Sequence, residues 1–175
     1  MKHTIVTLAL VFTAATAFAQ NPVSDVLRNN WNSVKKNIKE SAEMMPEEHY
    51  GFKPTPDVRS AGEILAHVAG ASYEFCASAK NEKAPFHEDS FEGKMTTKAQ
   101  IVKVTNDAIA YCDAAFAAVT DANAGEKVQA AFGGTGQTTR AASLVGQIGH
   151  DNEHYGNLVT YFRLKGLVPP SSRRQ

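Results

Sequence analysis

The sequence contains few cysteines and tryptophans, and neither sign of charge is in excess. Its 175 residues contain two cysteines and one tryptophan, and 18 basic residues balance 18 acidic ones, for a formal net charge of zero. Two cysteines exclude a scaffold held together by many disulfides. Zero net charge without a basic stripe argues against a nucleic-acid-binding protein, because such proteins displace counterions from phosphates with clustered positive charge. Internal repeats and low-complexity tracts are also absent from the sequence.

Only one long apolar run occurs, and it lies at the N-terminus. Lys2 precedes an apolar stretch over residues 4–18, which ends in Ala17-Phe18-Ala19. This arrangement is typical of a secretory signal peptide, whereas a membrane-spanning helix needs about 20 apolar residues. We therefore expect residues 1–19 to be a signal peptide and the protein to be secreted or periplasmic. Residues 20–175 are long enough for one domain with a sizeable core, without a further membrane segment.

Apolar residues at three- and four-residue steps predict four helices in this remaining stretch. The expected helices cover residues 24–45, 60–80, 97–119 and 138–165. The second and third begin with capping boxes, Ser60 with Glu63 and Thr97 with Gln100, in which each side chain satisfies a free backbone N–H. A long polar loop separates these two helices, and a glycine-rich segment before the last helix fits either a short hairpin or an irregular loop. The sequence therefore predicts an all-α four-helix bundle.

The two cysteines bear on the direction of the second and third helices. Cys76 lies 16 residues into the second helix, counted from Ser60, and Cys112 lies 15 residues into the third, counted from Thr97. Parallel helices place the two sulfurs at one height, while antiparallel helices offset them by about 12 Å, too far for a disulfide. A parallel pair needs a return crossover of about 30 Å, which the 16-residue loop can span at about 3.3 Å per residue. Export permits a disulfide, and two separate buried thiols are the alternative.

Three of the six histidines occupy positions suited to a metal ion. His150 and His154 are four residues apart on the last helix, so both project from one face, beside the apolar stripe. His67 is a polar residue in an apolar stretch of the second helix. Neutral imidazoles bind divalent ions, and three of them leave a position open for water or substrate. The alternatives are a chance pair on an exposed face and a hydrogen-bonded core histidine. His49 and His87 lie in polar loops, where we expect solvated side chains.

Residues near these histidines are candidates for supporting roles. Asp151, Glu153 and Tyr155 adjoin them in sequence, and the helical periodicity favours none of the three, although Glu153 is expected to face solvent. Arg163 lies two turns further on, where it either meets an anionic substrate or suits the end of the helix as a solvated side chain. No catalytic residue is assigned, because Ser-His-Asp and Cys-His patterns are absent and Asp151 stands where zinc proteases have a glutamate.

Four segments of the chain resemble proteins of the DinB-like family. Residues 41–54 (SAEMMPEEHYGFKP) resemble the segment that leads out of their first helix. Residues 59–67 (RSAGEILAH) are similar to the start of their second helix, which ends in the first metal-binding histidine. Residues 149–157 (GHDNEHYGN), followed by 161–170 (YFRLKGLVPP), are similar to their closing helix, which carries the second and third metal-binding histidines. The resemblance extends over essentially the whole chain after the signal peptide.

This resemblance implies a bundle with an up-down-down-up course and a long crossover between the second and third helices, in agreement with the parallel pair argued above. It also implies a nickel- or zinc-type ion on His67, His150 and His154. Many relatives have a glutamine where Asn157 stands. Known members include thiol-dependent transferases and isomerases of the cytosol, and their chemistry is not carried over to a chain that we expect to be exported.

The expected function is that of a divalent-metal-dependent enzyme of hydrolase or transferase type, acting on a small molecule. The alternative is a non-catalytic exported bundle that binds a metal or a small ligand. We expect no nucleic-acid partner and, after cleavage of the signal peptide, no membrane association. A homodimer is compatible with such a bundle.

Overall fold

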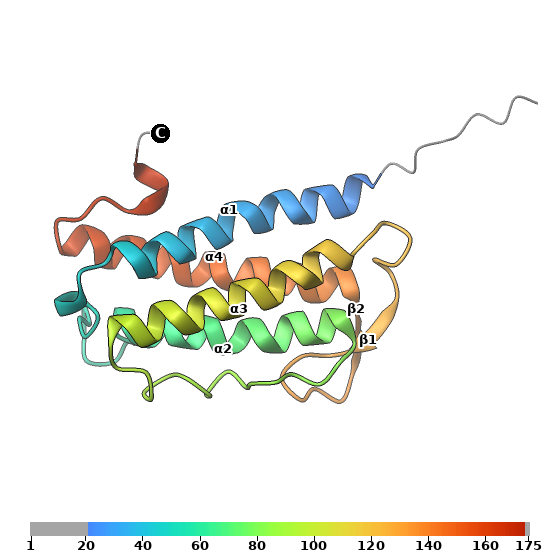
Figure 1. The fold of residues 1–175 in the computed structure, drawn as a ribbon, viewed down its shortest axis with the longest axis horizontal. Helices are drawn as coiled ribbons and strands as arrows, with labels where there is room; N and C mark the ends of the chain where they lie inside the picture. The colour runs from blue at the N-terminus through green and yellow to red at the C-terminus, as the bar shows by residue number, and fades with distance from the viewer. Residues whose placement is uncertain (1–20, 174–175) are drawn as a thin grey trace, which may run out of the picture.

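The computed structural model describes residues 21–173, and the predicted signal peptide over residues 1–19 lies outside this described range (Figure 1). The helices are α1 (Pro22–Met44), α2 (Ala61–Lys80), α3 (Lys98–Ala118) and α4 (Arg140–Leu164), with the short helical turns η1 (Glu47–His49) and η2 (Pro170–Ser172). The antiparallel strands β1 (Lys127–Gln129) and β2 (Gln137–Thr139) form a small hairpin before α4. The prediction of an all-α four-helix bundle is confirmed, and the glycine-rich segment takes the hairpin alternative.

Side-chain caps explain where α2, α3 and α4 begin. Ser60 accepts a hydrogen bond from the backbone N–H of Glu63, whose carboxylate accepts one from the Ser60 N–H. Thr97 and Gln100 form the same reciprocal pair at the start of α3. Thr139 caps α4 by accepting from the backbone N–H three residues later. Both capping boxes predicted from the sequence are therefore present.

The start of α1 depends on a residue far away in the sequence. The carboxylate of Asp121, in the segment after α3, accepts hydrogen bonds from the N–H groups of Val23 (3.2 Å) and Ser24 (2.9 Å). Pro22 occupies the first turn, where its missing N–H is not needed. Because of this distant cap, α1 begins two residues before the start expected from its apolar pattern.

The four helices follow an up-down-down-up course. In Figure 1, α1 and α4 run in one direction, and α2 and α3 run in the other. Both α1 and α2 pack against α3 and α4, so α1 and α2 occupy diagonal positions in the bundle. Since α2 and α3 are parallel, residues 81–97 must return along the length of the bundle to connect them. We refer to residues 81–97 as the crossover.

The crossover is packed closely on α2. A Cβ atom at Gly70 would lie 2.4 Å from the carbonyl oxygen of Glu88. The ring of His87 is largely exposed, as expected, yet its Nδ1 lies 2.6 Å from Oε1 of the buried Glu74 on α2. As a result, 17 of the 20 residues of α2 are buried. This helix is therefore the centre of the fold rather than one of four equivalent helices.

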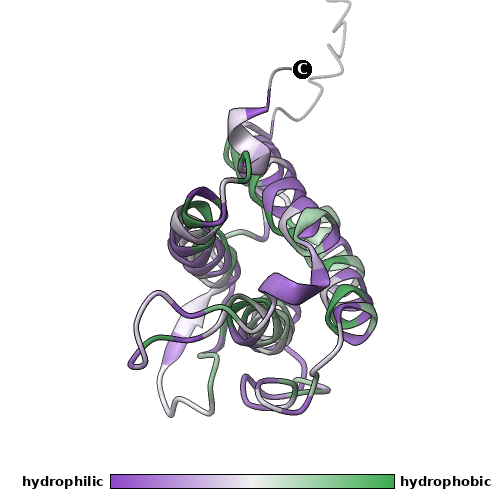
Figure 2. Cartoon of the chain, turned by 90° about the vertical axis from the view of Figure 1, so that its left-hand side faces the viewer, coloured by the Kyte–Doolittle hydropathy of each residue, from purple (hydrophilic) through white to green (hydrophobic). Residues whose placement is uncertain are grey.

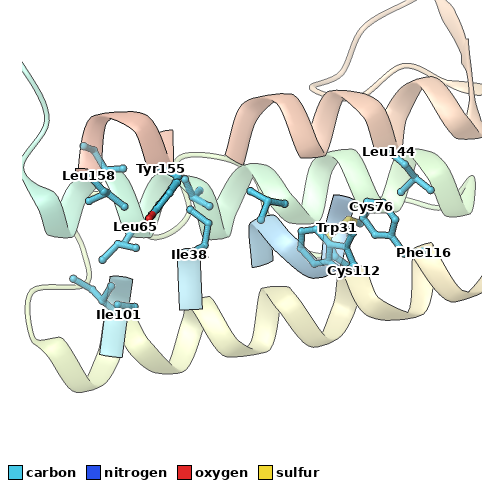
Figure 3. Close-up of a cluster of buried hydrophobic side chains, with 14 of the residues drawn as sticks. Trp31, Ile38, Leu65, Cys76, Ile101, Cys112, Phe116, Leu144, Tyr155 and Leu158 are labelled. Atoms are coloured by element: carbon cyan, nitrogen blue, oxygen red, sulfur yellow. A yellow bond between two sulfur atoms is a disulfide. The ribbon is translucent and has the colours of Figure 1, made fainter. Parts of the chain in front are cut away.

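The core contains the disulfide Cys76–Cys112, which joins α2 to α3 with its Cα atoms 5.3 Å apart (Figure 3). Beside it, the ring of Trp31 from α1 stacks on Phe116 from α3 at a centroid distance of 4.7 Å. Figure 2, which looks along the bundle, shows hydrophilic and hydrophobic residues alternating around the helices, as expected for helices that bury one side. Within residues 21–173, no helix combines the length and the apolar character needed to cross a membrane.

Gly70→Ala is expected to lower the free energy of unfolding by about 1–3 kcal/mol, the usual cost of overpacking. The added methyl group would meet the backbone of Glu88, so the crossover would have to move. Gly156→Ala is the matched control, because nothing lies within 4 Å of a Cβ atom there and replacing a helical glycine stabilises by up to about 1 kcal/mol. Urea unfolding followed by circular dichroism measures both changes. A Gly70→Ala protein as stable as wild type would contradict the packing of the crossover.

Candidate metal centre

Helices α2 and α4 bring three histidines together. His67 comes from the second turn of α2, and His150 and His154 come from consecutive turns of α4. One ring nitrogen from each lies within 4.8 Å of the other two, and no other such group of three metal-ligating side chains occurs within residues 21–173. Nε2 of His67 and Nε2 of His150 are 3.1 Å apart. This is close to the separation of about 3.3 Å between two nitrogens that bind one zinc ion tetrahedrally. We call these three residues the histidine cluster.

The histidine cluster is largely shielded from solvent. His67 and His154 are each 8% exposed. Burial, with the charges of His150, His67 and Arg59, lowers the pKa of His154 to about 4. Burial and the charge of Arg59 also lower the pKa of His67. Both rings are therefore neutral at pH 7, which is the state in which imidazole binds a metal ion.

Two carboxylates face the outer nitrogens of the cluster. Oε2 of Glu92, in the crossover, lies 3.4 Å from Nδ1 of His67. Oδ1 of Asp151 lies 3.5 Å from Nδ1 of His150. Histidines that bind metals usually donate their second ring N–H to a carboxylate or a carbonyl group, which orients the ring and makes it more basic. Both pairs leave Nε2 directed into the cluster.

Asp151 belongs to a buried polar network under the cluster. Its side chain is 2% exposed, and Nε2 of Gln147 donates both to its Oδ2 (2.9 Å) and to Oγ of Ser72 on α2 (2.8 Å). Burial raises the pKa of this carboxyl group. Oδ1 of Asp151 and Nδ1 of His150 and His154 are buried without a hydrogen-bond partner among residues 21–173. Unpaired buried polar atoms are costly, and a cation in the cluster would lower this cost by favouring the ionised carboxylate and polarising the rings. The residues therefore fit a metal ion.

The other supporting candidates make no hydrogen bond or ion pair with the cluster. Glu153 is exposed, as expected. The hydroxyl of Tyr155 donates to Oγ of Ser171 and accepts from the N–H of the same residue, so this tyrosine ties down the C-terminal segment. Arg163 is exposed and donates to Oγ of Ser172 at 3.2 Å. Of the two interpretations of Arg163, the structure agrees with the solvated one.

Two residues beside the cluster were not identified from the sequence. Nε of Arg59 donates to Oε1 of Glu92 at 2.8 Å, while the other oxygen of this carboxylate faces His67. Arg59 comes just before the cap of α2, and Glu92 belongs to the crossover. Helical periodicity identified the three histidines, but it cannot predict where the side chain of a loop residue lies. The one available signal was the length of the crossover, which required it to run along α2.

A cleft of about 650 Å³ opens beside the cluster. It lies between the segment before α2, the crossover and α4. Its wall combines apolar groups such as Ile64 with a larger number of polar and charged ones. The lining includes the side chains of Asp57, Arg59, Glu92, Glu153, His154 and Tyr161. Because His154 forms part of this wall, the cleft borders the histidine cluster.

The fold and the cluster define a class of protein, a four-helix bundle of up-down-down-up course with three histidines gathered between α2 and α4. Residues 31–158 match the family model of the DinB superfamily, and the chain belongs to this superfamily. The family membership inferred from the sequence segments is thus confirmed. Among curated proteins, none matches the sequence.

Three solved structures show the same fold. A DinB-like protein from Bacillus cereus is 16% identical, with a TM-score of 0.68, and the match covers 83% of this chain and 95% of that one. The DinB-like protein YjoA from Bacillus subtilis is 23% identical, with a TM-score of 0.65 and coverage of 86% and 99%. A conserved protein from Enterococcus faecalis is 14% identical, with a TM-score of 0.64 and coverage of 83% and 98%. At these identities the likeness concerns the fold alone.

The metal-free protein is expected to lose stability through His154 as the pH falls from about 6.5 to about 4. In this window the unfolded chain binds a proton at this ring and the folded chain does not, so acidification favours unfolding, by at most about 1.4 kcal/mol per pH unit. His154→Gln should flatten this part of the pH dependence. Urea unfolding at several pH values measures the stability, and NMR titration of the ring protons measures the pKa. A pKa near 6.5 for His154 in the folded protein would contradict the expected burial.

Proposed function

We propose that His67, His150 and His154 hold one divalent metal ion, of the nickel or zinc type. The convergence of three shielded ring nitrogens within 4.8 Å of one another is the observation that supports this most directly. Imidazole ligands suit zinc, nickel, copper and iron, whereas calcium and magnesium prefer oxygen ligands. The resemblance to DinB-like proteins narrows this choice to nickel or zinc.

We further propose that the protein is an enzyme of hydrolase or transferase type, acting on a small molecule bound in the cleft. Structural zinc sites have four protein ligands, whereas catalytic ones have three and keep a position open. When bound, the ion would supply Lewis acidity and lower the pKa of a coordinated water to about 7. Glu92 and Asp151 face the outer nitrogens of His67 and His150, and the burial of His67 and His154 limits the access of bulk water to the cluster.

A non-catalytic protein that binds a metal or a small ligand is the second candidate. One observation favours it: the two carboxylates nearest to the cluster, Glu92 and Asp151, face ring nitrogens. Neither is therefore free to act as a general base, and the exposed Glu153 is the remaining carboxylate on α4 that lines the cleft. The two candidates share the metal site and differ in turnover.

We also propose that the protein acts outside the cytoplasm. The N-terminal pattern of a signal peptide supports this, and so does the disulfide between Cys76 and Cys112. Disulfides are rare in cytosolic proteins, where thiols are kept reduced, and common in exported ones.

Wild-type protein, purified without chelators or a metal-binding tag, is expected to contain about one nickel or zinc ion per chain, the stoichiometry of a single site closed by three protein ligands. The variant with His67→Ala, His150→Ala and His154→Ala should contain none, while the control His49→Ala, which removes a half-buried ring from η1, should keep the ion. Elemental analysis by mass spectrometry measures the content. Equal metal content in the triple variant and the wild type would refute the site. Hydrolysis of ester, amide or phosphate substrates that occurs only with the ion bound would identify an enzyme. Metal binding without turnover would identify the binding protein.

Asp151→Asn is expected to lower metal affinity by about 10- to 100-fold, the usual effect of losing a carboxylate behind a metal-binding histidine. The asparagine can still accept from Gln147, but it no longer offers a charged acceptor to Nδ1 of His150. Glu153→Gln is the matched control, because it removes an exposed carboxylate from the same helix and should change the affinity little. Competition with a chromophoric chelator measures both. Unchanged affinity in Asp151→Asn would show that this carboxylate does not support the site.

A further inference from the structure

We infer that Arg59 binds a carboxylate group of the substrate in the cleft, so that the substrate class is small molecules with a free carboxylate. The inference rests on the proposed function, whose substrate it specifies. It starts from the position of Arg59, at the end of the segment that leads into α2, on the wall of the cleft to which His154 also contributes.

Arg59 is held at two points. Its backbone carbonyl accepts a hydrogen bond from the hydroxyl of Tyr161 at 2.7 Å, and its Nε donates to Oε1 of Glu92 at 2.8 Å. Both partners also line the cleft. An arginine side chain normally loses much rotamer freedom when it binds a ligand. Because Arg59 is restrained in advance, a ligand meets a guanidinium group that is already in place.

The outer nitrogens of Arg59 remain available. Glu92 accepts only from Nε–H, and within residues 21–173 neither Nη group makes a hydrogen bond. The side chain is 43% exposed, although it lies beside the buried cluster. A pair of guanidinium N–H groups matches the two oxygens of a carboxylate in a bidentate arrangement. Free donors of this geometry on the wall of a cleft are suited to an anionic group of a ligand.

Arg59 also has a defined relation to the histidine cluster. Glu92 connects them, since Oε1 accepts from Arg59 and Oε2 faces Nδ1 of His67. Arg59, Glu92 and His154 also line the same cleft, so the guanidinium and the cluster border one space. A small molecule can therefore place its reacting group at the histidines while its carboxylate meets Arg59.

The other charges of the cleft favour a singly charged group, rather than a doubly charged one, opposite Arg59. Asp57 and Glu153 also line it, and neither is neutralised by Arg59, which pairs with Glu92. A phosphate group carries about −1.5 to −2 charges at pH 7, so these two carboxylates repel it more strongly than they repel a carboxylate. An ammonium group at the same place would meet the positive charges of Arg59 and of the ion. A carboxylate is thus the group that this wall accommodates best.

The test compares succinate, in which one carboxylate can meet Arg59 while the other lies at the ion, with butyrate, which has the same number of carbons and only one carboxylate to place. With zinc-loaded protein, calorimetry should show succinate binding at least about tenfold more tightly than butyrate. Arg59→Gln should abolish this preference and retain zinc, Arg59→Lys should keep part of it, and the control Arg163→Gln should keep all of it. In wild-type protein, with or without zinc, succinate should shift the NMR signal of the Arg59 Nε–H in a saturable way.

The inference is overturned if Arg59→Gln keeps the preference for succinate, or if the Arg59 signal does not respond. It is also overturned if 3-phosphonopropionate binds more tightly than succinate in a manner that depends on Arg59, because the site would then be one for phosphate-type groups. Failure of the proposed metal site appears separately, as wild-type protein that takes up no zinc, and the NMR titration of metal-free protein still decides the role of Arg59. Thermal unfolding of each variant confirms that it is folded.

Discussion

The burial of α2 on nearly all sides is the constraint on which the rest of the structure depends. Because α2 runs parallel to α3, the connection between them has to return over the face of α2 that would otherwise meet solvent. Polar side chains on this helix therefore need partners inside the protein. Ser72 is paired with Gln147, Glu74 with His87, and Ser78 with Ser143 and the carbonyl group of Gln129. These pairs fix α2 relative to α4, the hairpin and the crossover.

The histidine cluster follows from the same arrangement. His67 projects from α2 toward α4, where the spacing of His150 and His154 places two further rings on the facing side. The crossover then supplies Glu92 from one side, and the network of Asp151 lies on the other. Two helices position the inner nitrogens, while a carboxylate from a loop and one from a buried network face two of the outer nitrogens. A site built in this way needs little rearrangement when an ion binds.

The sequence was most informative where a pattern repeats at helical spacing. The capping boxes at Ser60 and Thr97 located the starts of two helices, and the heights of the two cysteines agree with the parallel direction that the structure shows. The three histidines could be singled out because each adjoins an apolar stripe on its helix. All of these signals are local, and they depend only on the geometry of a helix.

Contacts between distant segments left no comparable signal. Asp121 caps α1 from a position 98 residues away from Val23, and nothing in either segment indicates the pairing. Glu92 and Arg59 lie outside the helices, so periodicity could not place them beside His67. Asp151 was one of three candidates, and its hydrogen bond with Gln147 singled it out.

The disulfide has a further consequence, which concerns proteolysis. It joins two residues that are 36 positions apart in the sequence, on either side of the whole crossover. One cut in the crossover therefore leaves two fragments still covalently joined, one carrying His67 and the other His150 and His154.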